Sequence, residues 1–364
     1  MKECRSLVRA GYTVFLIAPA EAPQIIDGVN IVPFSRTRNR FERFTKTTWG
    51  LYKKARKIDA DIYHFHDPEI MVVGWLLKLR GKRIIYDVHE DLPRQVRTKD
   101  WIPSLLRPLV AGLVELAETI TARLIDGIVA ATPTIAARFP DGKVELVQNF
   151  PILEETVLAG MAYKDRPAII SFLGVMGQIR GTEELVKAMK FVSPELRAEL
   201  HLTGQFYPEN FRSRLSSLPG WKSVVARDWV PRSEVLTELG LSRIGVVTYH
   251  PVANYVKAQP IKLFEYMANG IPVVVSDFPL WKELVEREGC GLTVNPLDPR
   301  AVATAIEWLL RNPDKAQKMG EKGRSAVSKT YNWAPEARKL TNFYEKIARA
   351  EKRQASTRLN PQPT

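Results

Sequence analysis

The stretch "PIKLFEYMANGIPVVVSD", residues 260–277, indicates how this chain folds. Pro260 suits the first position of a helix, and Gly270 suits the left-handed residue just past the helix end. The helix leads directly into residues 271–277, a strand that is apolar on both faces. Such a strand is typical of a parallel sheet that helices cover on both sides.

Short apolar runs alternate with helix-length segments along the rest of the chain as well. Before a polar, proline-containing stretch at 163–168, the expected strands are 13–19, 29–34, 61–67, 83–89, 127–132 and 144–149. After that stretch, the expected strands are 168–174, 198–204, 223–227, 243–249, 271–277 and 291–295. The alternation predicts an α/β protein with two doubly wound, Rossmann-like domains.

The length of 364 residues exceeds one core of usual size and agrees with two domains. The expected parts are an N-terminal domain over 1–163, a C-terminal domain over 164–334, a last helix over 335–352 that packs back on the first domain, and a disordered tail over 353–364. Two doubly wound domains in tandem leave a cleft at the carboxyl ends of their strands, and we expect ligands to bind there.

The cysteine content and the hydropathy bear on location. Cys4 and Cys290 are too few for a disulfide framework or a cysteine metal site. A reducing compartment, the cytoplasm, is therefore the simplest interpretation. No run of eighteen or more apolar residues is present, so we expect no membrane-spanning helix.

The net charge of +13 is partly local. Residues 36–57 carry nine basic side chains against the single Glu42, with aromatic side chains among them. An anionic membrane surface or nucleic acid could bind such a stretch, and a solvated helix face is the plain alternative. Zinc-finger spacing, RNP-type motifs and basic-zipper heptads are absent from the sequence, so we favour the inner face of the cell membrane and expect no nucleic-acid partner.

The helix that begins near Ile261 carries groups suited to a nucleotide. Because the helix follows the strand at 243–249, its amino end lies at the carboxyl edge of the second sheet, where free N–H groups favour an anion. Lys262 adds a cation, and Glu265, one turn further along, suits a pair of ribose hydroxyls. The plain alternative is an ordinary surface pair at spacing i, i+3.

A second loop at the same sheet edge is rich in glycine. It follows the strand at 168–174, in the stretch "FLGVMGQIRGTEELVKAM", residues 172–189. Gly174, Gly177 and Gly181 let the turn approach a ligand closely, and Arg180 brings a permanent positive charge. Together with the helix at 260–270, this loop predicts a diphosphate site between two loops of one sheet.

At this point the sequence resembles a known family. The segments "SFLGVMGQIRGTEELVKAM", "HLTGQF", "WVPRSEVLTELGLSRIGVV" and "PIKLFEYMANGIPVVVSD", in that order, are similar to the second half of retaining, nucleotide-sugar-dependent glycosyltransferases of family four, a large group with the GT-B fold. "DIYHFHDP" and "IIYDVHEDLP" resemble strand ends of its first half, as in bacterial cell-envelope and exopolysaccharide enzymes.

The resemblance implies roles for individual residues. Glu265 matches the second glutamate of the E-x7-E motif, which clamps the ribose, and Arg180 matches the basic residue that neutralises the donor diphosphate. Val230 matches the segment whose backbone contacts the base. His89 matches the histidine of the first domain that contacts the donor sugar near the reacting carbon, so we name it as the candidate catalytic residue.

Three departures from the family pattern stand out. Lys257 replaces the first glutamate of E-x7-E, so that Lys257 or Lys262 would reach a phosphate or an acidic sugar instead. Val175 stands where the family usually has an arginine. Family members usually begin with a strand before the helix that starts here at Lys2, and without it neighbouring strands would expose unpaired backbone. A truncated chain is therefore expected.

The implied function is transfer of a sugar from a nucleotide sugar to a cell-envelope glycan or polyprenyl-linked acceptor, with retention of configuration and no cofactor. His66, Glu90 and Asp91 are the candidate acceptor-side residues. His64 and His66 lie on one side of a strand, as a metal pair would, but no third ligand is evident nearby, so no metal is expected. The alternatives are a nucleotide-sugar 2-epimerase of the same fold and a catalytically silent, membrane-associated homologue.

Overall fold

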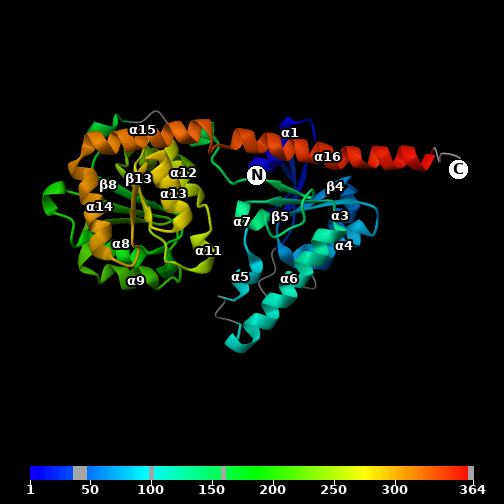
Figure 1. The fold of residues 1–364 in the computed structure, drawn as a ribbon, viewed down its shortest axis with the longest axis horizontal. Helices are drawn as coiled ribbons and strands as arrows, with labels where there is room; N and C mark the ends of the chain where they lie inside the picture. The colour runs from blue at the N-terminus through cyan, green and yellow to red at the C-terminus, as the bar shows by residue number, and fades with distance from the viewer. Residues whose placement is uncertain (36–46, 98–101, 157–160, 360–364) are drawn as a thin grey trace. The chain divides into compact units, whose positions relative to one another are not determined.

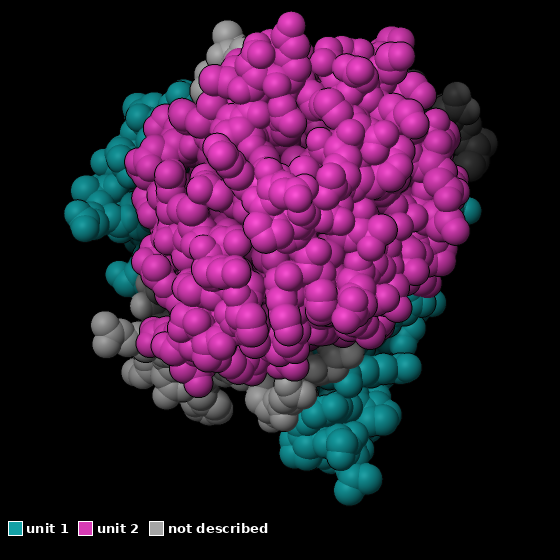
Figure 2. Space-filling model, turned by 90° about the vertical axis from the view of Figure 1, so that its left-hand side faces the viewer, with its two compact units in different colours: residues 1–148, 334–364 teal, residues 149–333 magenta. Residues whose placement is uncertain are grey.

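The chain forms two compact units. The computed structural model describes residues 1–35, 47–97, 102–156 and 161–359. One unit comprises residues 1–148 together with 334–364, and the other comprises residues 149–333 (Figure 2). The division at residue 148 lies before the predicted boundary at 163, and the N-terminal half of the basic segment, residues 36–46, lies outside the described residues.

Residues 149–333 contain a six-stranded sheet in which all neighbouring strands are parallel. Its strands are β8 (Ile169–Leu173), β9 (Glu199–Thr203), β10 (Val224–Arg227), β11 (Ile244–Val247), β12 (Val273–Ser276) and β13 (Gly291–Val294). They lie in the order β10-β9-β8-β11-β12-β13. The chain therefore builds the sheet outward in one direction from β8 and in the other from β11. The boundary between β8 and β11 is the switch point where doubly wound sheets bind ligands.

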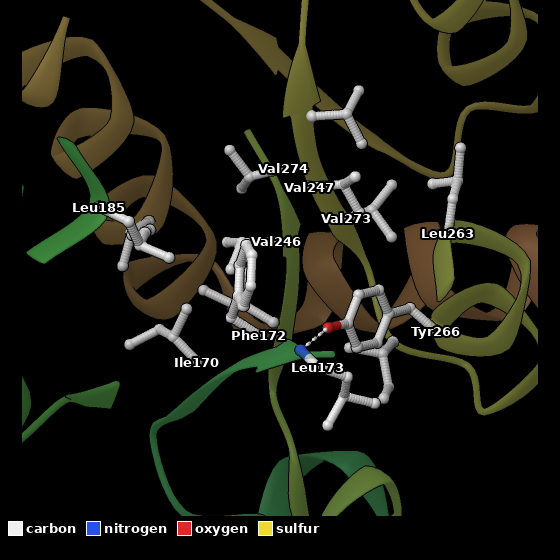
Figure 3. Packing of buried hydrophobic residues seen from close by; sticks show 14 of the residues in the cluster. Ile170, Phe172, Leu173, Leu185, Val246, Val247, Leu263, Tyr266, Val273 and Val274 are labelled. Carbon is white, nitrogen blue, oxygen red and sulfur yellow. Dashed lines mark hydrogen bonds between the residues drawn. The ribbon is translucent and has the colours of Figure 1, made fainter. Parts of the chain in front are cut away.

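Helices surround this sheet (Figure 1). They are α8 (Thr182–Met189), α9 (Phe211–Ser216), α10 (Arg232–Leu241), α11 (Ala253–Val256), α12 (Ile261–Ala268), α13 (Pro279–Glu288), α14 (Pro299–Arg311) and α15 (Pro313–Lys329). Every residue of β8, β11 and β12 is buried, as strands covered on both faces should be. Tyr266 from α12 packs under β8, where its hydroxyl donates to Ser171 O and accepts from Leu173 N, each at 3.0 Å (Figure 3). This contact fixes α12 against the central strand.

Residues 1–148 contain two sheets. The strands β4 (Ile62–Phe65), β5 (Arg83–Val88), β6 (Gly127–Ala130) and β7 (Val144–Leu146) pair in parallel in that order. The second sheet has β3 (Val29–Pro33) at its centre, parallel to β1 (Phe15–Ala18) and antiparallel to β2 (Gln24–Ile26). The strand β2 was not expected from the sequence, and all three of its residues are exposed.

The helices of this unit are α1 (Lys2–Arg9), α3 (Thr48–Ile58), α4 (Met71–Lys78), α5 (Leu92–Val96), α6 (Arg107–Leu124), α7 (Pro133–Ala136) and most of α16 (Trp333–Leu359). The last helix packs on the start of β6. A Cβ atom at Gly127 would lie 2.5 Å from the ring of Phe343 and 2.6 Å from Ile347, both on α16. The helix α16 runs on to Leu359, through most of the stretch predicted to be a disordered tail. None of the described helices combines the length and the apolar character needed to cross a membrane.

Candidate functional site

Two loops meet at the switch point between β8 and β11. The loop after β8 turns through Gly174 and Gly181, both with positive φ (107° and 68°). A Cβ atom at Gly181 would lie 1.7 Å from the carbonyl oxygen of Thr248, the residue that follows β11. A Cβ atom at Gly174 would lie 3.5 Å from Nζ of Lys262 on α12. The glycines therefore let this loop lie directly against the segment that leads from β11 to α12.

Lys262 is the central cation of this site. Its side chain is buried with the residue only 8% exposed, and its Nζ atom has no hydrogen-bond partner among the described residues. The ammonium group lies 4.1 Å from the ring centroid of Phe172 and 5.3 Å from that of Tyr249. Burial, together with the positive charge of Arg180, lowers the pKa of Lys262 to about 7, and the negative charge of Glu265 opposes the shift. The site thus holds a buried amine that no acceptor within the described segments satisfies.

Other polar groups gather around Lys262. Arg180 ends a 3-10 turn (Gln178–Arg180), and its guanidinium lies 5.6 Å from the ring centroid of Tyr249. Gly177 begins this turn and donates its N–H to the hydroxyl of Thr182 at 3.2 Å. Thr248 has a buried hydroxyl for which no hydrogen-bond partner is present among the described residues. Buried polar atoms normally have partners, so unsatisfied ones at a loop junction indicate a place for a polar ligand.

Glu265 lies one turn beyond Lys262, and its side chain is only 12% exposed. Its carboxylate is held by Arg232, at the start of α10, with a distance of 2.7 Å from Nη2 to Oε1. The sequence suggested a surface pair of Lys262 with Glu265 as the plain alternative, but the Glu265 carboxylate pairs with Arg232. Sequence reasoning missed Arg232, because 33 residues separate it from Glu265.

The other residues named for the donor lie around the same edge. Ile261 is the first residue of α12, with Pro260 just before the helix as its N-cap rather than inside it. Val230 is half-buried in the loop between β10 and α10. Lys257 follows the short helix α11 and has an exposed side chain.

A second constellation lies within residues 1–148, at the carboxyl ends of β4 and β5. His64, His66 and His89 surround Asp87, which is 1% exposed. His66 Nδ1 lies 2.9 Å and His89 Nε2 lies 3.0 Å from Oδ2 of Asp87. The strand register brings them together, since His64 of β4 lies opposite Ile85 of β5. The sequence paired His64 with His66 and showed no third ligand nearby; the structure places Asp87 and His89 beside them.

Electrostatics in this group follow from the shared carboxylate. Burial alone would raise the pKa of Asp87, but the nearby ring of His64 and the close contacts of His66 and His89 outweigh burial and hold that pKa well below its usual range. For His66 and His89, burial acts to lower the pKa, yet the hydrogen bond and negative charge of Asp87 leave each pKa raised. The cluster therefore keeps a carboxylate ionised inside the protein.

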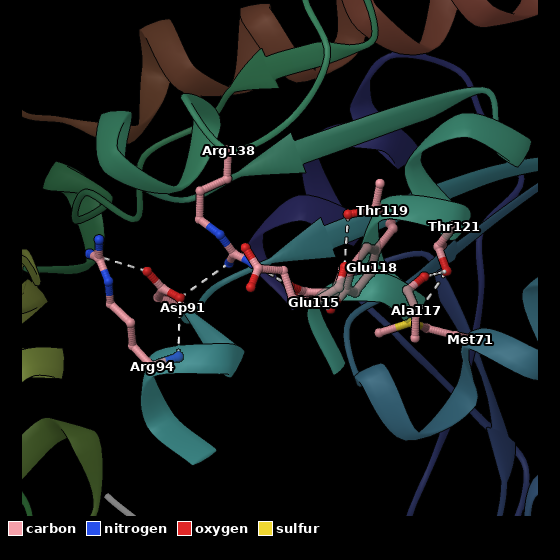
Figure 4. Close-up of polar contacts among 10 residues, drawn as sticks. Met71, Asp91, Arg94, Glu115, Ala117, Glu118, Thr119, Thr121 and Arg138 are labelled. Atoms are coloured by element: carbon pink, nitrogen blue, oxygen red, sulfur yellow. Dashed lines mark hydrogen bonds and ion pairs between the residues drawn. The ribbon is translucent and has the colours of Figure 1, made fainter. Parts of the chain in front are cut away.

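Glu90 and Asp91 follow directly after His89. Asp91 caps α5 and forms ion pairs with Arg94 at 3.3 Å and Arg138 at 3.4 Å (Figure 4). Arg138 also pairs with Glu118, which is buried in α6. Glu90 is exposed and accepts a hydrogen bond from Gln95. Asp91 thus has structural partners, whereas contact of either residue with an acceptor stays a prediction.

The fold and the site define a class of protein: two Rossmann-like units, the second with a cationic, glycine-lined switch point. Two family models match the chain, one described as Glycosyltransferase Family 4 over residues 2–150 and one described as Glycosyl transferases group 1 over residues 167–312. The chain belongs to the family-four glycosyltransferases. The predicted membership of this family is therefore confirmed.

Curated relatives match part of the chain. It is 25% identical over 186 residues to an MMP alpha-(1->4)-mannosyltransferase of Mycolicibacterium hassiacum, covering 50% of this chain and 44% of the relative. It is 26% identical over 208 residues to an alpha-maltose-1-phosphate synthase of Mycolicibacterium smegmatis, covering 54% and 52%. The matched stretch spans about half the length of these relatives.

Solved structures resemble nearly the whole chain. Sucrose-phosphate synthase from Thermosynechococcus elongatus superposes with a TM-score of 0.77 at 19% identity, covering 96% of this chain and 92% of the other. WaaG, a glycosyltransferase involved in lipopolysaccharide biosynthesis, gives 0.71 at 13% identity and 94% of each chain. HepE from Anabaena, solved in complex with UDP-glucose, gives 0.65 at 13% identity, covering 90% and 86%. These likenesses show that the fold is GT-B, as predicted.

Proposed function

We propose that this protein is a retaining glycosyltransferase that takes its sugar from a nucleotide diphosphate sugar. The observation that supports this proposal best is the buried amine of Lys262, which has no hydrogen-bond acceptor in the described part of the chain and lies near the guanidinium of Arg180. A buried cation without a partner costs several kcal/mol. A pyrophosphate bound against Lys262 would offset that cost.

The position of Lys262 favours a nucleotide over a free anion. It lies at the switch point, where the N-terminus of α12 and the glycine turn after β8 present backbone N–H groups. Glu265 is the nearest carboxylate along the helix and would accept from ribose hydroxyls, while Arg232 holds it in place. The loop containing Val230, which follows β10 and precedes α10, would contact the base.

Charge stabilisation would be the main catalytic effect. As the bond between sugar and diphosphate breaks, negative charge develops on the leaving group, and positive charges fixed in advance lower the barrier. Lys262 and Arg180 would supply those charges. Contact of His89 with the donor sugar remains a prediction from the family resemblance.

For the acceptor, we infer a lipid-linked sugar or cell-envelope glycan used at an anionic membrane surface. One side of α6 carries apolar side chains that are 39% to 61% exposed: Leu109, Leu113, Leu116, Ile120 and Leu124. Their spacing of three and four residues forms one stripe along the helix. The described part of the basic segment, in α3, adds Lys53, Lys54, Arg56 and Lys57. An apolar stripe and basic side chains suit the interface of an anionic bilayer.

The decisive experiment for the donor is a calorimetric screen of UDP, GDP and ADP and their sugars against the full chain. We expect one nucleotide to bind in the micromolar range and Lys262→Met to remove that binding. Lys282→Met, which alters an exposed lysine of the same unit, is the matched control. Equal binding by both variants, or no binding by the wild type, would contradict the proposal.

Reaction class and membrane surface need separate measurements. The anomeric configuration of the product, read by NMR, tests retention, and release of a free sugar without an acceptor would point to an epimerase.

For the surface, co-sedimentation with vesicles containing anionic lipid should fall in a Leu113→Gln, Leu116→Gln variant. The donor affinity of this variant should be unchanged, and undiminished sedimentation would exclude α6 as the contact.

A further inference from the structure

The histidine cluster of residues 1–148 calls for an explanation that sugar transfer does not supply. The chain has five histidines, and three of them, His64, His66 and His89, have ring nitrogens directed at Asp87. Glu3, at the start of α1, completes the surroundings: Glu3, His64, His66 and Asp87 each offer a ligand atom within 4.8 Å of the others. Such a convergence is uncommon for side chains that merely fill space.

The spacing of the ring nitrogens and the carboxylate fits the coordination sphere of a metal ion. Nitrogen and oxygen ligands at about 2.0–2.1 Å from a metal stand roughly 3.3 Å apart in a tetrahedral arrangement. His66 Nδ1 is 3.3 Å from His89 Nε2, and the two atoms are 2.9 Å and 3.0 Å from Asp87 Oδ2. His64 Nε2 is 3.6 Å from the same oxygen. One ion could therefore contact all four groups after small adjustments.

Unsatisfied atoms point to the same place. His64 Nε2 and Asp87 Oδ1 are buried and have no hydrogen-bond partner among the described residues. Asp87 is almost wholly buried, so its second oxygen does not reach bulk water. On its outer side, His64 Nδ1 lies 2.8 Å from the hydroxyl of Tyr344 on α16. When Nδ1–H donates to that hydroxyl oxygen, the lone pair of Nε2 faces Asp87, which is how metal-binding histidines are usually oriented.

A plain hydrogen-bond network explains the cluster less well. His66 Nδ1 and His89 Nε2 face each other at 3.3 Å as well as facing Asp87. A network must arrange protons so that three rings share one carboxylate oxygen, and it leaves Asp87 Oδ1 and His64 Nε2 unused. A cation would use the lone pairs of the three ring nitrogens and of Asp87 Oδ2 at once.

We propose that His64, His66, Asp87 and His89 form a site for a divalent transition-metal ion, with Zn²⁺ as the ion that this set of imidazoles and one carboxylate suits best. The carboxylate of Glu3, which lies within 4.8 Å of ligand atoms of His64, His66 and Asp87, is a further candidate ligand. The side chains of His66 and His89 are 47% and 41% exposed, so one coordination position faces solvent. The ion would tie together the ends of β4 and β5 and the start of α1.

Metal content is the first test, and it requires no nucleotide. The full chain, freed of any affinity tag, is equilibrated with ZnCl2, dialysed against metal-free buffer and analysed by atomic emission. We expect about one zinc ion per chain and a melting temperature that falls by several degrees when a chelator is added. His66→Gln changes a partly exposed ligand and should lower zinc affinity at least tenfold. Asp87→Asn, close in shape, should do the same.

The matched control is His201→Gln, a histidine of residues 149–333 outside the cluster. It should retain zinc as the wild type does. Visible absorption of Co²⁺ in place of zinc gives a second measurement, because its bands report nitrogen and oxygen ligands directly and should vanish in His66→Gln. If the wild type retains no more metal than His66→Gln, or if His201→Gln loses as much, the site is a hydrogen-bonded cluster and the proposal is wrong.

Discussion

The ammonium group of Lys262 lies 4.1 Å from the ring centroid of Phe172, at the end of the central strand β8. The ring offers a weak cation–π contact, which does not replace the water that the amine loses on burial. Burial of the Lys262 amine without an acceptor in the described parts of the chain therefore costs stability, and such a cost is common at functional sites.

Replacement of Lys262 by methionine should separate stability from binding. Methionine keeps the length and the apolar stem but removes the buried charge, so the melting temperature at neutral pH should rise by several degrees. Affinity for the nucleotide should fall at least a hundredfold, because the pyrophosphate loses a buried cation. Differential scanning fluorimetry and calorimetry on one preparation measure both. A variant that is less stable than the wild type would show that Lys262 has a structural partner.

Donor affinity should depend on pH through Lys262. With a pKa of about 7, the free amine is charged below pH 7 and loses its proton above it. Bound pyrophosphate raises that pKa, so affinity should be level below pH 7 and should fall above it by up to tenfold per pH unit. A nucleotide sugar is the suitable probe, because its pyrophosphate diester does not titrate in this range. The Lys262→Met variant should show a flat profile, and a flat wild-type profile would refute the assignment.

The stability of the free protein should change with pH in the direction opposite to the donor affinity. The pKa of Lys262 is lower in the folded chain than its ordinary value of 10.5 in the unfolded chain. Between about pH 7 and pH 10.5 the unfolded chain therefore binds more protons at this residue, and the contribution to stability rises with pH. Urea unfolding at several pH values gives the slope of the unfolding free energy against pH. In Lys262→Met this slope should correspond to the uptake of up to one proton fewer on unfolding. Equal slopes would count against a depressed pKa.

The turn at Gly181 should tolerate no side chain. Its φ of 68° and the carbonyl oxygen of Thr248, 1.7 Å from the place of a Cβ, both oppose alanine. We expect Gly181→Ala to lower stability by about 2 kcal/mol or more and to weaken donor binding. Gly112 in α6 is the matched control, since a Cβ there meets nothing within 4 Å. Gly112→Ala should be neutral or stabilising by up to about 1 kcal/mol.

Removal of Glu265 should discriminate between two parts of the ligand. Glu265→Ala should weaken binding of the nucleoside diphosphate about tenfold by loss of the ribose contact, while inorganic pyrophosphate binds as before or more tightly. Competition titrations with both ligands measure the difference. Arg232→Ala is the companion variant, because it frees the carboxylate without removing it. Equal loss for both ligands would place Glu265 beside the phosphates instead.

The sequence predicts the sheet of residues 149–333 well, because its strands are buried on both faces and read as bare apolar runs. β12 illustrates this: the predicted strand 271–277 contains Val273–Ser276. The exposed strand β2 escaped prediction, since none of its three residues is buried and the strand therefore shows no apolar pattern. Gly270 was expected to be left-handed and has a φ of 64°.

The sequence predicts the parts of the site that lie within one short loop. It does not predict the parts that strand pairing brings together. Arg180, Lys262 and Glu265 were named from two short loops, but the depth of Lys262 could not be read from spacing that equally suits a surface pair. Asp87 was not named at all. It joins His64 and His66 only through the pairing of β4 with β5, and a single sequence carries no sign of which residues face each other across two strands.

The packing of Phe343 against Gly127 has a consequence for biosynthesis. The core of the first unit needs side chains from α16, and Tyr344 of that helix also contacts His64. A ribosome makes residues 149–333 before it reaches α16, so the second unit can complete its core while the first still waits for its last helix. The segment translated first would then be the last to become resistant to protease, and nascent chains stalled ahead of residue 343 should reveal that order.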